Sequence, residues 1–269
     1  MLRTCEGHTD WILNAVFSPD NTRIATGGAD RKLILWDAAT CEILHVYKHK
    51  DWVIRVAFSP DGQQLIFGTS DTCLIWWSIP EWQAIHTFTG HGTEVLGVAF
   101  TASGKSVVSS GSDGRAILWD LVSGSFINTF NEHAEGVWAS DISPNDQHMI
   151  SGSLDGGVIL WDMTTGNLIR RFEGHSNQVL TIEFSPDGSQ AVSGAADKTA
   201  IIWQVDTGKV LFTLTHESAV RSVGFHPDGK HVVTGDSQGN IILWDSTTGT
   251  EIRRIMVPEG VQVTTLDIG

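Results

Sequence analysis

The sequence predicts an all-β fold made of one four-stranded unit repeated six times, and three observations support this prediction. A His is followed 28 residues later by a Trp six times, at steps of 41 or 42 residues, beginning with His8 and Trp36. Each interval contains short runs of alternating apolar and polar residues, bounded by turn residues, and no amphipathic helical period. A fixed period of about 40 residues indicates stacked copies of one supersecondary unit.

The interval from His175 to His216 shows the order of the expected elements. Strands are expected at 179–184, 190–193, 199–203 and 210–214, with Ser-Pro-Asp-Gly at 185–188 as the first turn. Four short strands per repeat are typical of the antiparallel blades of a β-propeller, whose sheets pack face to face around a ring. The sequence therefore predicts one propeller domain over residues 1–269, with blades at approximately 8–48, 49–90, 91–132, 133–174, 175–215 and 216–257.

The two ends of the chain do not fit a whole number of blades. Residues 1–7 align with the outer strand of a blade, and residues 258–269 resemble a first strand. We therefore expect six complete blades plus the first and fourth strands of an incomplete seventh, in a chain cut from a longer protein. The alternative is a closed ring of six blades that leaves both end strands unpaired.

Polar residues recur with each His–Trp pair and predict a buried hydrogen-bond relay. A Trp indole N–H, a strand hydroxyl, the His imidazole and a turn carboxylate are spaced so that each contacts the next, which satisfies every buried polar group. The expected relays are His8, Thr26, Asp30 and Trp36; His91, Ser109, Asp113 and Trp119; His133, Ser151, Asp155 and Trp161; and His175, Ser193, Asp197 and Trp203. Phe67 replaces the hydroxyl in blade 2 and Gln238 replaces the carboxylate in blade 6, so we expect these blades to be locally softer.

The Gly-His pairs, such as Gly7-His8 and Gly174-His175, and the Trp-Asp pairs, such as Trp36-Asp37, resemble those of the WD-repeat (WD-40) β-propeller family. The resemblance covers essentially the whole chain. It implies a propeller that acts as an interaction platform, and it names no partner. In this family the loops that enter the first strands lie on the face called the top, which commonly binds partners.

Composition argues against several other functions. The formal net charge is −14 and no basic cluster is present, so nucleic acid is not an expected partner, and no apolar stretch is long enough to cross a membrane. Cys5, Cys41 and Cys73 show no paired spacing, so we expect no disulfide framework and a cytoplasmic location. No metal site, cofactor or catalytic residue is expected; the remaining histidines, including His226 and His231, are interpreted as surface residues, and Ser237 lies in a G-x-S-x-G match that lacks a following helix.

Variable side chains beside each repeat His are the candidate binding residues. At three and five residues after the His, on the top face, the sequence places Trp11, Leu13, Trp52, Ile54, Glu94, Trp138 and Arg221. Large aromatic residues there are typical interaction hot spots, although they could instead fill gaps between blades. Carboxylates in the same loops favour a basic partner segment, unless they form only a solvated acidic surface.

The sequence thus predicts a non-catalytic scaffold that binds a protein or peptide on its top face, either as a monomer or within a longer chain. The alternative is a regulatory or sensory array of a larger multidomain protein, such as an NTPase or a kinase.

Overall fold

A computed structural model describes residues 4–257 and contains 24 strands in this part of the chain. The strands of the first three sheets are β1 (Ile12–Phe17), β2 (Arg23–Gly28), β3 (Lys32–Asp37), β4 (Ile43–Lys48), β5 (Val53–Phe58), β6 (Gln64–Thr69), β7 (Cys73–Ser78), β8 (Gln83–Thr89), β9 (Val95–Phe100), β10 (Ser106–Gly111), β11 (Ala116–Asp120) and β12 (Phe126–Phe130). Those of the other three are β13 (Val137–Ile142), β14 (His148–Ser153), β15 (Val158–Asp162), β16 (Leu168–Phe172), β17 (Val179–Phe184), β18 (Gln190–Ala195), β19 (Thr199–Gln204), β20 (Lys209–Thr215), β21 (Val220–Phe225), β22 (His231–Asp236), β23 (Asn240–Asp245) and β24 (Glu251–Met256). Within these residues, no helix is long and apolar enough to cross a membrane.

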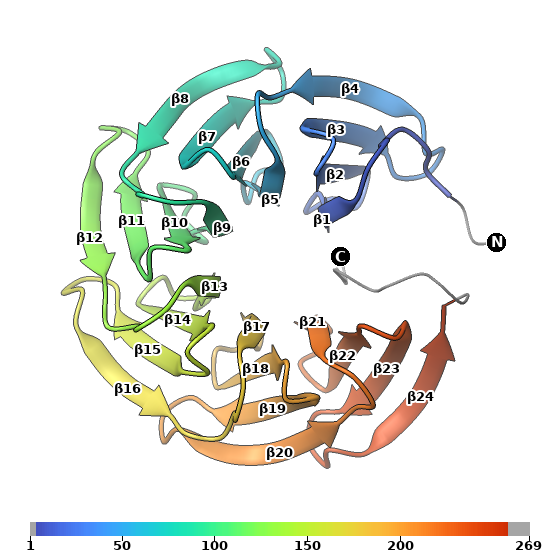
Figure 1. The fold of residues 1–269 in the computed structure, drawn as a ribbon, viewed down its shortest axis with the longest axis vertical. Helices are drawn as coiled ribbons and strands as arrows, with labels where there is room; N and C mark the ends of the chain where they lie inside the picture. Colours follow the sequence, from blue (N-terminus) through green and yellow to red (C-terminus); the bar gives the residue numbers. More distant parts are fainter. Residues whose placement is uncertain (1–3, 258–269) are drawn as a thin grey trace.

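Each sheet is an antiparallel meander of four consecutive strands, and the six sheets are arranged around a centre (Figure 1). The first strand of each sheet lies innermost and the fourth lies outermost. Within the described residues, each blade packs against the next from blade 1 to blade 6, whereas β21 and β1 lie farther apart. The predicted propeller of four-stranded antiparallel blades is confirmed.

The hydrophobic core lies between blades. In one cluster, Leu160 and Phe172 of blade 4 pack with Ile182, Phe184 and Trp203 of blade 5. Similar clusters join blades 1 and 2, 2 and 3, 3 and 4, and 5 and 6. A four-stranded sheet exposes two apolar faces, so each blade needs its neighbours to bury them.

The turn between the first and second strands is held by a side-chain bracket. In blade 5, the Ser185 hydroxyl donates to Asp187 Oδ1 at 2.6 Å and the Gly188 N–H donates to the Ser185 carbonyl at 2.8 Å. Gly188 adopts a φ of 72°, which a glycine reaches without strain. Blades 1 and 2 use the same Ser and Asp positions.

The incomplete seventh blade is not supported, because residues 4–257, which the structure describes, form six blades. Residues 4–11 form no strand and instead lie against blade 1, where Cys5 is disulfide-bonded to Cys41 in the β3–β4 turn. Gly7 lies on the Trp36 ring so closely that a Cβ there would be 2.7 Å from it. The expected strand at 258–269 lies outside the described residues.

The prediction that the cysteines form no disulfide is also wrong. Cys5 and Cys41 are 36 residues apart in sequence and match no spacing motif. They meet because the N-terminal segment folds back on its own blade, so their pairing depends on tertiary structure. Cys73 is a free cysteine.

Candidate functional site

The expected relays are present as continuous hydrogen-bond chains in blades 1, 3, 4 and 5. In blade 3, the Trp119 indole N–H donates to Ser109 Oγ at 2.8 Å, Ser109 Oγ bonds to His91 Nε2 at 2.8 Å, and His91 Nδ1 lies 3.1 Å from Asp113 Oδ1. The other three relays connect His8, Thr26, Asp30 and Trp36; His133, Ser151, Asp155 and Trp161; and His175, Ser193, Asp197 and Trp203.

The order of donors along the relay makes the imidazole neutral. Ser109 Oγ accepts the indole proton, so its own proton is donated to His91 Nε2, and the Nδ1–H of His91 then donates to Asp113. Burial lowers the pKa of His91, which favours the same uncharged form. Asp113 also accepts the Gly92 N–H at 3.0 Å. The relay therefore connects the loop before β9 to the turn after β10, and its role is structural.

Blade 2 keeps the contact between His49 Nε2 and Asp71 Oδ1, at 3.0 Å, but replaces the rest of the relay with aromatic packing. Phe67 occupies the hydroxyl position, and the buried Trp77 indole N–H has no hydrogen-bond partner. The Trp77 ring instead lies 4.4 Å from Tyr47, 5.6 Å from Trp82 and 6.1 Å from Phe67, measured between ring centroids. Trp82 thus packs, partly buried, against the hydrophobic cluster between blades 1 and 2. Whether blade 2 is locally softer stays a prediction.

Blade 6 has a complete relay that sequence spacing missed. Trp244 donates to Thr234 Oγ1 at 2.8 Å, Thr234 bonds to His216 Nε2 at 2.9 Å, and His216 Nδ1 lies 3.3 Å from Asp236 Oδ2. Asp236 is two residues before Gln238 and fully buried. The expectation that blade 6 lacks the carboxylate is therefore wrong, because a neighbouring position of the same turn supplies it.

Each first strand contains one β-bulge near its start, always at the fifth residue after the repeat His. In blade 1, Ile12 pairs with Gly28 and Asn14 with Gly27, so Leu13 has no partner in the ladder. A bulge leaves one residue unpaired and turns its side chain away from the regular alternation. The six bulged residues are Leu13, Ile54, Leu96, Trp138, Leu180 and Arg221.

The bulged residues surround one cavity of about 390 Å³, which we call the top cavity. All seven side chains that the sequence singled out line it: Trp11, Leu13, Trp52, Ile54, Glu94, Trp138 and Arg221. It is also lined by four that the sequence prediction omitted: Arg55, Leu96, Ser112 and Leu180. Leu96 and Leu180 share the bulge position with Leu13 and could have been included for that reason. No pattern distinguished Arg55 or Ser112.

The two exposed tryptophans project from fixed backbone. Trp11 is 79% exposed and Trp52 is 50% exposed. The Trp11 N–H donates to Asp10 Oδ1 at 2.8 Å, and its carbonyl accepts the Ala29 N–H at 2.8 Å. Trp52 is held in the same way, by Asp51 Oδ1 at 2.9 Å and by the Ser70 N–H at 3.1 Å. Both indoles are therefore presented at the cavity by ordered loops.

The top cavity carries charges of both signs. Glu94 Oε2 accepts a hydrogen bond from the Ser112 hydroxyl at 3.0 Å, on the blade 3 side. Arg221 Nε donates to Ser237 Oγ at 3.1 Å on the blade 6 side. Ser237 lies in the β22–β23 turn and β23 follows it, so the strand-to-helix turn of a serine nucleophile is not formed.

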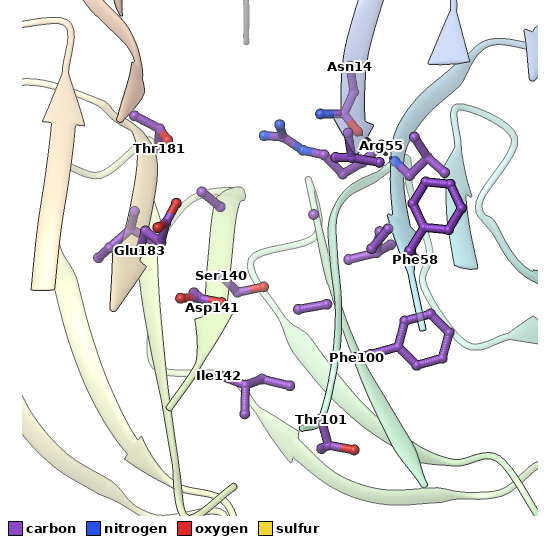
Figure 2. A pocket seen from close by; sticks show the side chains of 18 of the residues that line it. Asn14, Arg55, Phe58, Phe100, Thr101, Ser140, Asp141, Ile142, Thr181 and Glu183 are labelled. Carbon is purple, nitrogen blue, oxygen red and sulfur yellow. Dashed lines mark hydrogen bonds between the residues drawn. The ribbon is translucent and has the colours of Figure 1, made fainter. Parts of the chain in front are cut away.

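Below the top cavity lies the central channel, with a volume of about 420 Å³. Arg55 lines both spaces, and Figure 2 shows its guanidinium reaching into the channel across from Asp141 and Glu183. Asp141 Oδ2 accepts the Phe184 N–H at 2.8 Å, which joins β13 to β17. Burial raises the pKa of Asp141 to about 6.

Six four-stranded blades around a central channel, with a cavity at one mouth of it, define a β-propeller. Comparison with known proteins agrees: the family model described as WD40, the WD domain or G-beta repeat, matches residues 1–37, 41–78, 82–120, 124–162, 166–204 and 208–245. The chain belongs to the WD-repeat family. Propellers of this family are generally non-catalytic scaffolds that bind other proteins.

A curated relative is similar over one short segment. The UBP9-binding protein bun62 of Schizosaccharomyces pombe is 40% identical over 48 residues, which are 16% of this chain and 9% of that protein. The match therefore spans less than a tenth of the relative's length. Its name describes a protein that binds another protein.

Proposed function

We propose that the top cavity binds a segment of a partner protein and that this segment carries a basic residue. The observation that carries the proposal is the convergence of side chains from all six blades on one cavity, with two exposed indoles at its edge. An exposed Trp contributes little to folding, whereas a Trp at the edge of a pocket is a typical hot spot of an interface.

The size and lining of the top cavity suit one or a few inserted side chains. Its volume of about 390 Å³ lies within the range of pockets that bind small ligands or anchor residues. Leu13, Ile54, Leu96 and Leu180 provide an apolar base, and Trp11 and Trp52 would cover the inserted group. Burial of this apolar surface would provide most of the affinity.

Charge favours a basic residue near blades 1 to 3. Asp10 and Asp51 directly precede the exposed tryptophans in the chain, and Glu94 lines the same cavity. Hydrogen bonds from the Ser70 side chain and the Trp52 N–H lower the pKa of Asp51. A Lys or Arg placed there gains both ion pairing and contact with an indole face. Arg221 lines the cavity on the blade 6 side and would repel a cation placed there, so we expect the basic residue on the Glu94 side.

Affinity capture with the described chain as bait tests the proposal. Partners retained by the wild-type protein should be lost with the double variant Trp11→Ala/Trp52→Ala. The matched control is Val122→Ala/Phe126→Ala, which removes two side chains that are 89% and 69% exposed and do not line the cavity. An unchanged set of partners with the tryptophan variant would contradict the proposal.

A second measurement tests the basic residue separately. For each partner that depends on the tryptophans, Glu94→Gln and increased salt should both weaken binding, since they remove or screen the same attraction. Tryptophan-dependent binding that ignores both changes would refute the basic segment and leave the cavity as an apolar site.

A further inference from the structure

The turn between β21 and β22 differs from the same turn in other blades in a way that suits metal binding. Where blades 1, 2, 4 and 5 place a Ser, blade 6 places His226, and a second histidine, His231, starts β22. Between them, Asp228 occupies the usual carboxylate position. A Ser–Asp bracket has thus become a His–Asp–His cluster, at the end of the strands opposite the top cavity.

The three side chains converge on one point. His226 Nδ1 lies 3.1 Å from Asp228 Oδ2, and His231 Nδ1 lies 2.7 Å from the same oxygen. All three potential ligand atoms lie within 4.8 Å of one another, and the two imidazole planes are at 90°. Tetrahedral Zn²⁺ with bonds of about 2.0–2.1 Å separates its ligand atoms by about 3.3 Å. Each imidazole nitrogen would therefore move about 0.2–0.6 Å away from the carboxylate oxygen, and the two nitrogens would move toward each other by up to about 1.5 Å.

The backbone of the turn holds these side chains in place without a ligand. The His226 N–H donates to the His231 carbonyl at 2.9 Å and the Gly229 N–H donates to the His226 carbonyl at 2.8 Å. Asp228 Oδ1 accepts the Lys230 N–H at 2.8 Å, which leaves Oδ2 directed at the imidazoles.

Two hydrogen bonds must be given up when a metal binds: one of 2.7 Å between His231 Nδ1 and Asp228 Oδ2, in whose place the metal would lie, and a longer one at His226. His226 Nδ1 accepts the Asp228 N–H at 3.2 Å, and a metal would take the same lone pair. Asp228 and His226 are exposed, so water can replace that long hydrogen bond at little cost. The exposure also gives an ion a direct path to the cluster.

We propose that His226, Asp228 and His231 form a binding site for a divalent transition metal, for which Zn²⁺ is the best match. Two imidazoles and one carboxylate are ligands that Zn²⁺ accepts, whereas Mg²⁺ and Ca²⁺ prefer oxygen alone. Three protein ligands leave a fourth position for water or for a group from another molecule. The site is independent of the proposed function of the top cavity.

Calorimetric titration of the untagged, metal-free chain with Zn²⁺ tests the proposal. One equivalent should bind, and Co²⁺ in its place should give the strong visible absorption of a tetrahedral site. His226→Ser restores the residue that four other blades use and should preserve the turn. It should weaken Zn²⁺ binding by about 100-fold or more, as should His231→Ala, since each removes a direct ligand.

The matched control is His148→Ala. His148 begins β14 at the position equivalent to His231, but Ser143 and Asn145 stand in place of the other two ligands. This variant should bind Zn²⁺ as tightly as wild type. Absence of stoichiometric binding by the wild type, or equal affinity in His226→Ser, would overturn the proposal.

Discussion

Removing the Ser109 hydroxyl should cost much more stability than removing the hydroxyl of the next residue. Ser109 and Ser110 are both fully buried neighbours on β10. Ser109 Oγ makes two hydrogen bonds of 2.8 Å, to Trp119 and to His91, and its loss leaves both partners buried and unsatisfied. Ser110 Oγ has one long contact of 3.3 Å, to Ser140 Oγ.

At about 1–3 kcal/mol for each of the two orphaned buried partners, Ser109→Ala should lower the free energy of unfolding by roughly 2–6 kcal/mol. Ser110→Ala should lower it by no more than about 1 kcal/mol. Urea unfolding followed by tryptophan fluorescence measures both, provided that the slope of the transition is unchanged. If the two variants differ by less than about 0.5 kcal/mol, the relay does not stabilise the blade as we infer.

Three further results are expected. Asp141→Asn should stabilise the protein at pH 8 but not at pH 4, because burial raises the folded-state pKa of Asp141 from 3.8 to about 6 and the wild-type fold therefore loses stability as the pH rises. The free energy of unfolding at pH 8 should increase by at most about 3 kcal/mol, and a difference between variant and wild type that is the same at both pH values would refute the reasoning. For that variant, the urea concentration at the unfolding midpoint should decrease as the pH is lowered from 7 to 5. Burial lowers the folded-state pKa of five histidines, so the unfolded chain binds more protons in this range; they are His49, His91, His133, His175 and His216. A midpoint that does not change with pH would contradict this. Cys5→Ser should lower the free energy of unfolding by up to about 4 kcal/mol, as expected when a disulfide that closes a loop of 36 residues is removed. Cys73→Ser, which changes the free cysteine, is the control, and equal stability of the two variants would count against the Cys5–Cys41 disulfide.

The repeat makes much of this structure predictable from sequence. His, Ser or Thr, Asp and Trp at fixed offsets predict both the strand order and the relay, because each offset places its residue at one position of a repeated sheet. The same register predicts which side chains border the channel mouth. For Trp11 and Trp52, the prediction needs only their distance from His8 and His49.

The features that sequence missed depend on contacts that the register does not encode. Asp236 takes over from Gln238 because two positions of one turn can reach the same imidazole. Cys5 meets Cys41 only because the N-terminal segment folds back on blade 1. His226 and His231 form no spacing motif, since a turn rather than a helix brings them together.

The bulge at the start of every first strand separates recognition from folding. A residue outside the ladder can be replaced without changing strand register or the core between blades, so Leu13, Trp138 and Arg221 can be as different as they are in otherwise equivalent positions. The ring therefore offers six adjacent sites at which mutation can explore new partners while the framework stays constant. For protein engineering, these six positions form a compact library for redirecting the specificity of the propeller.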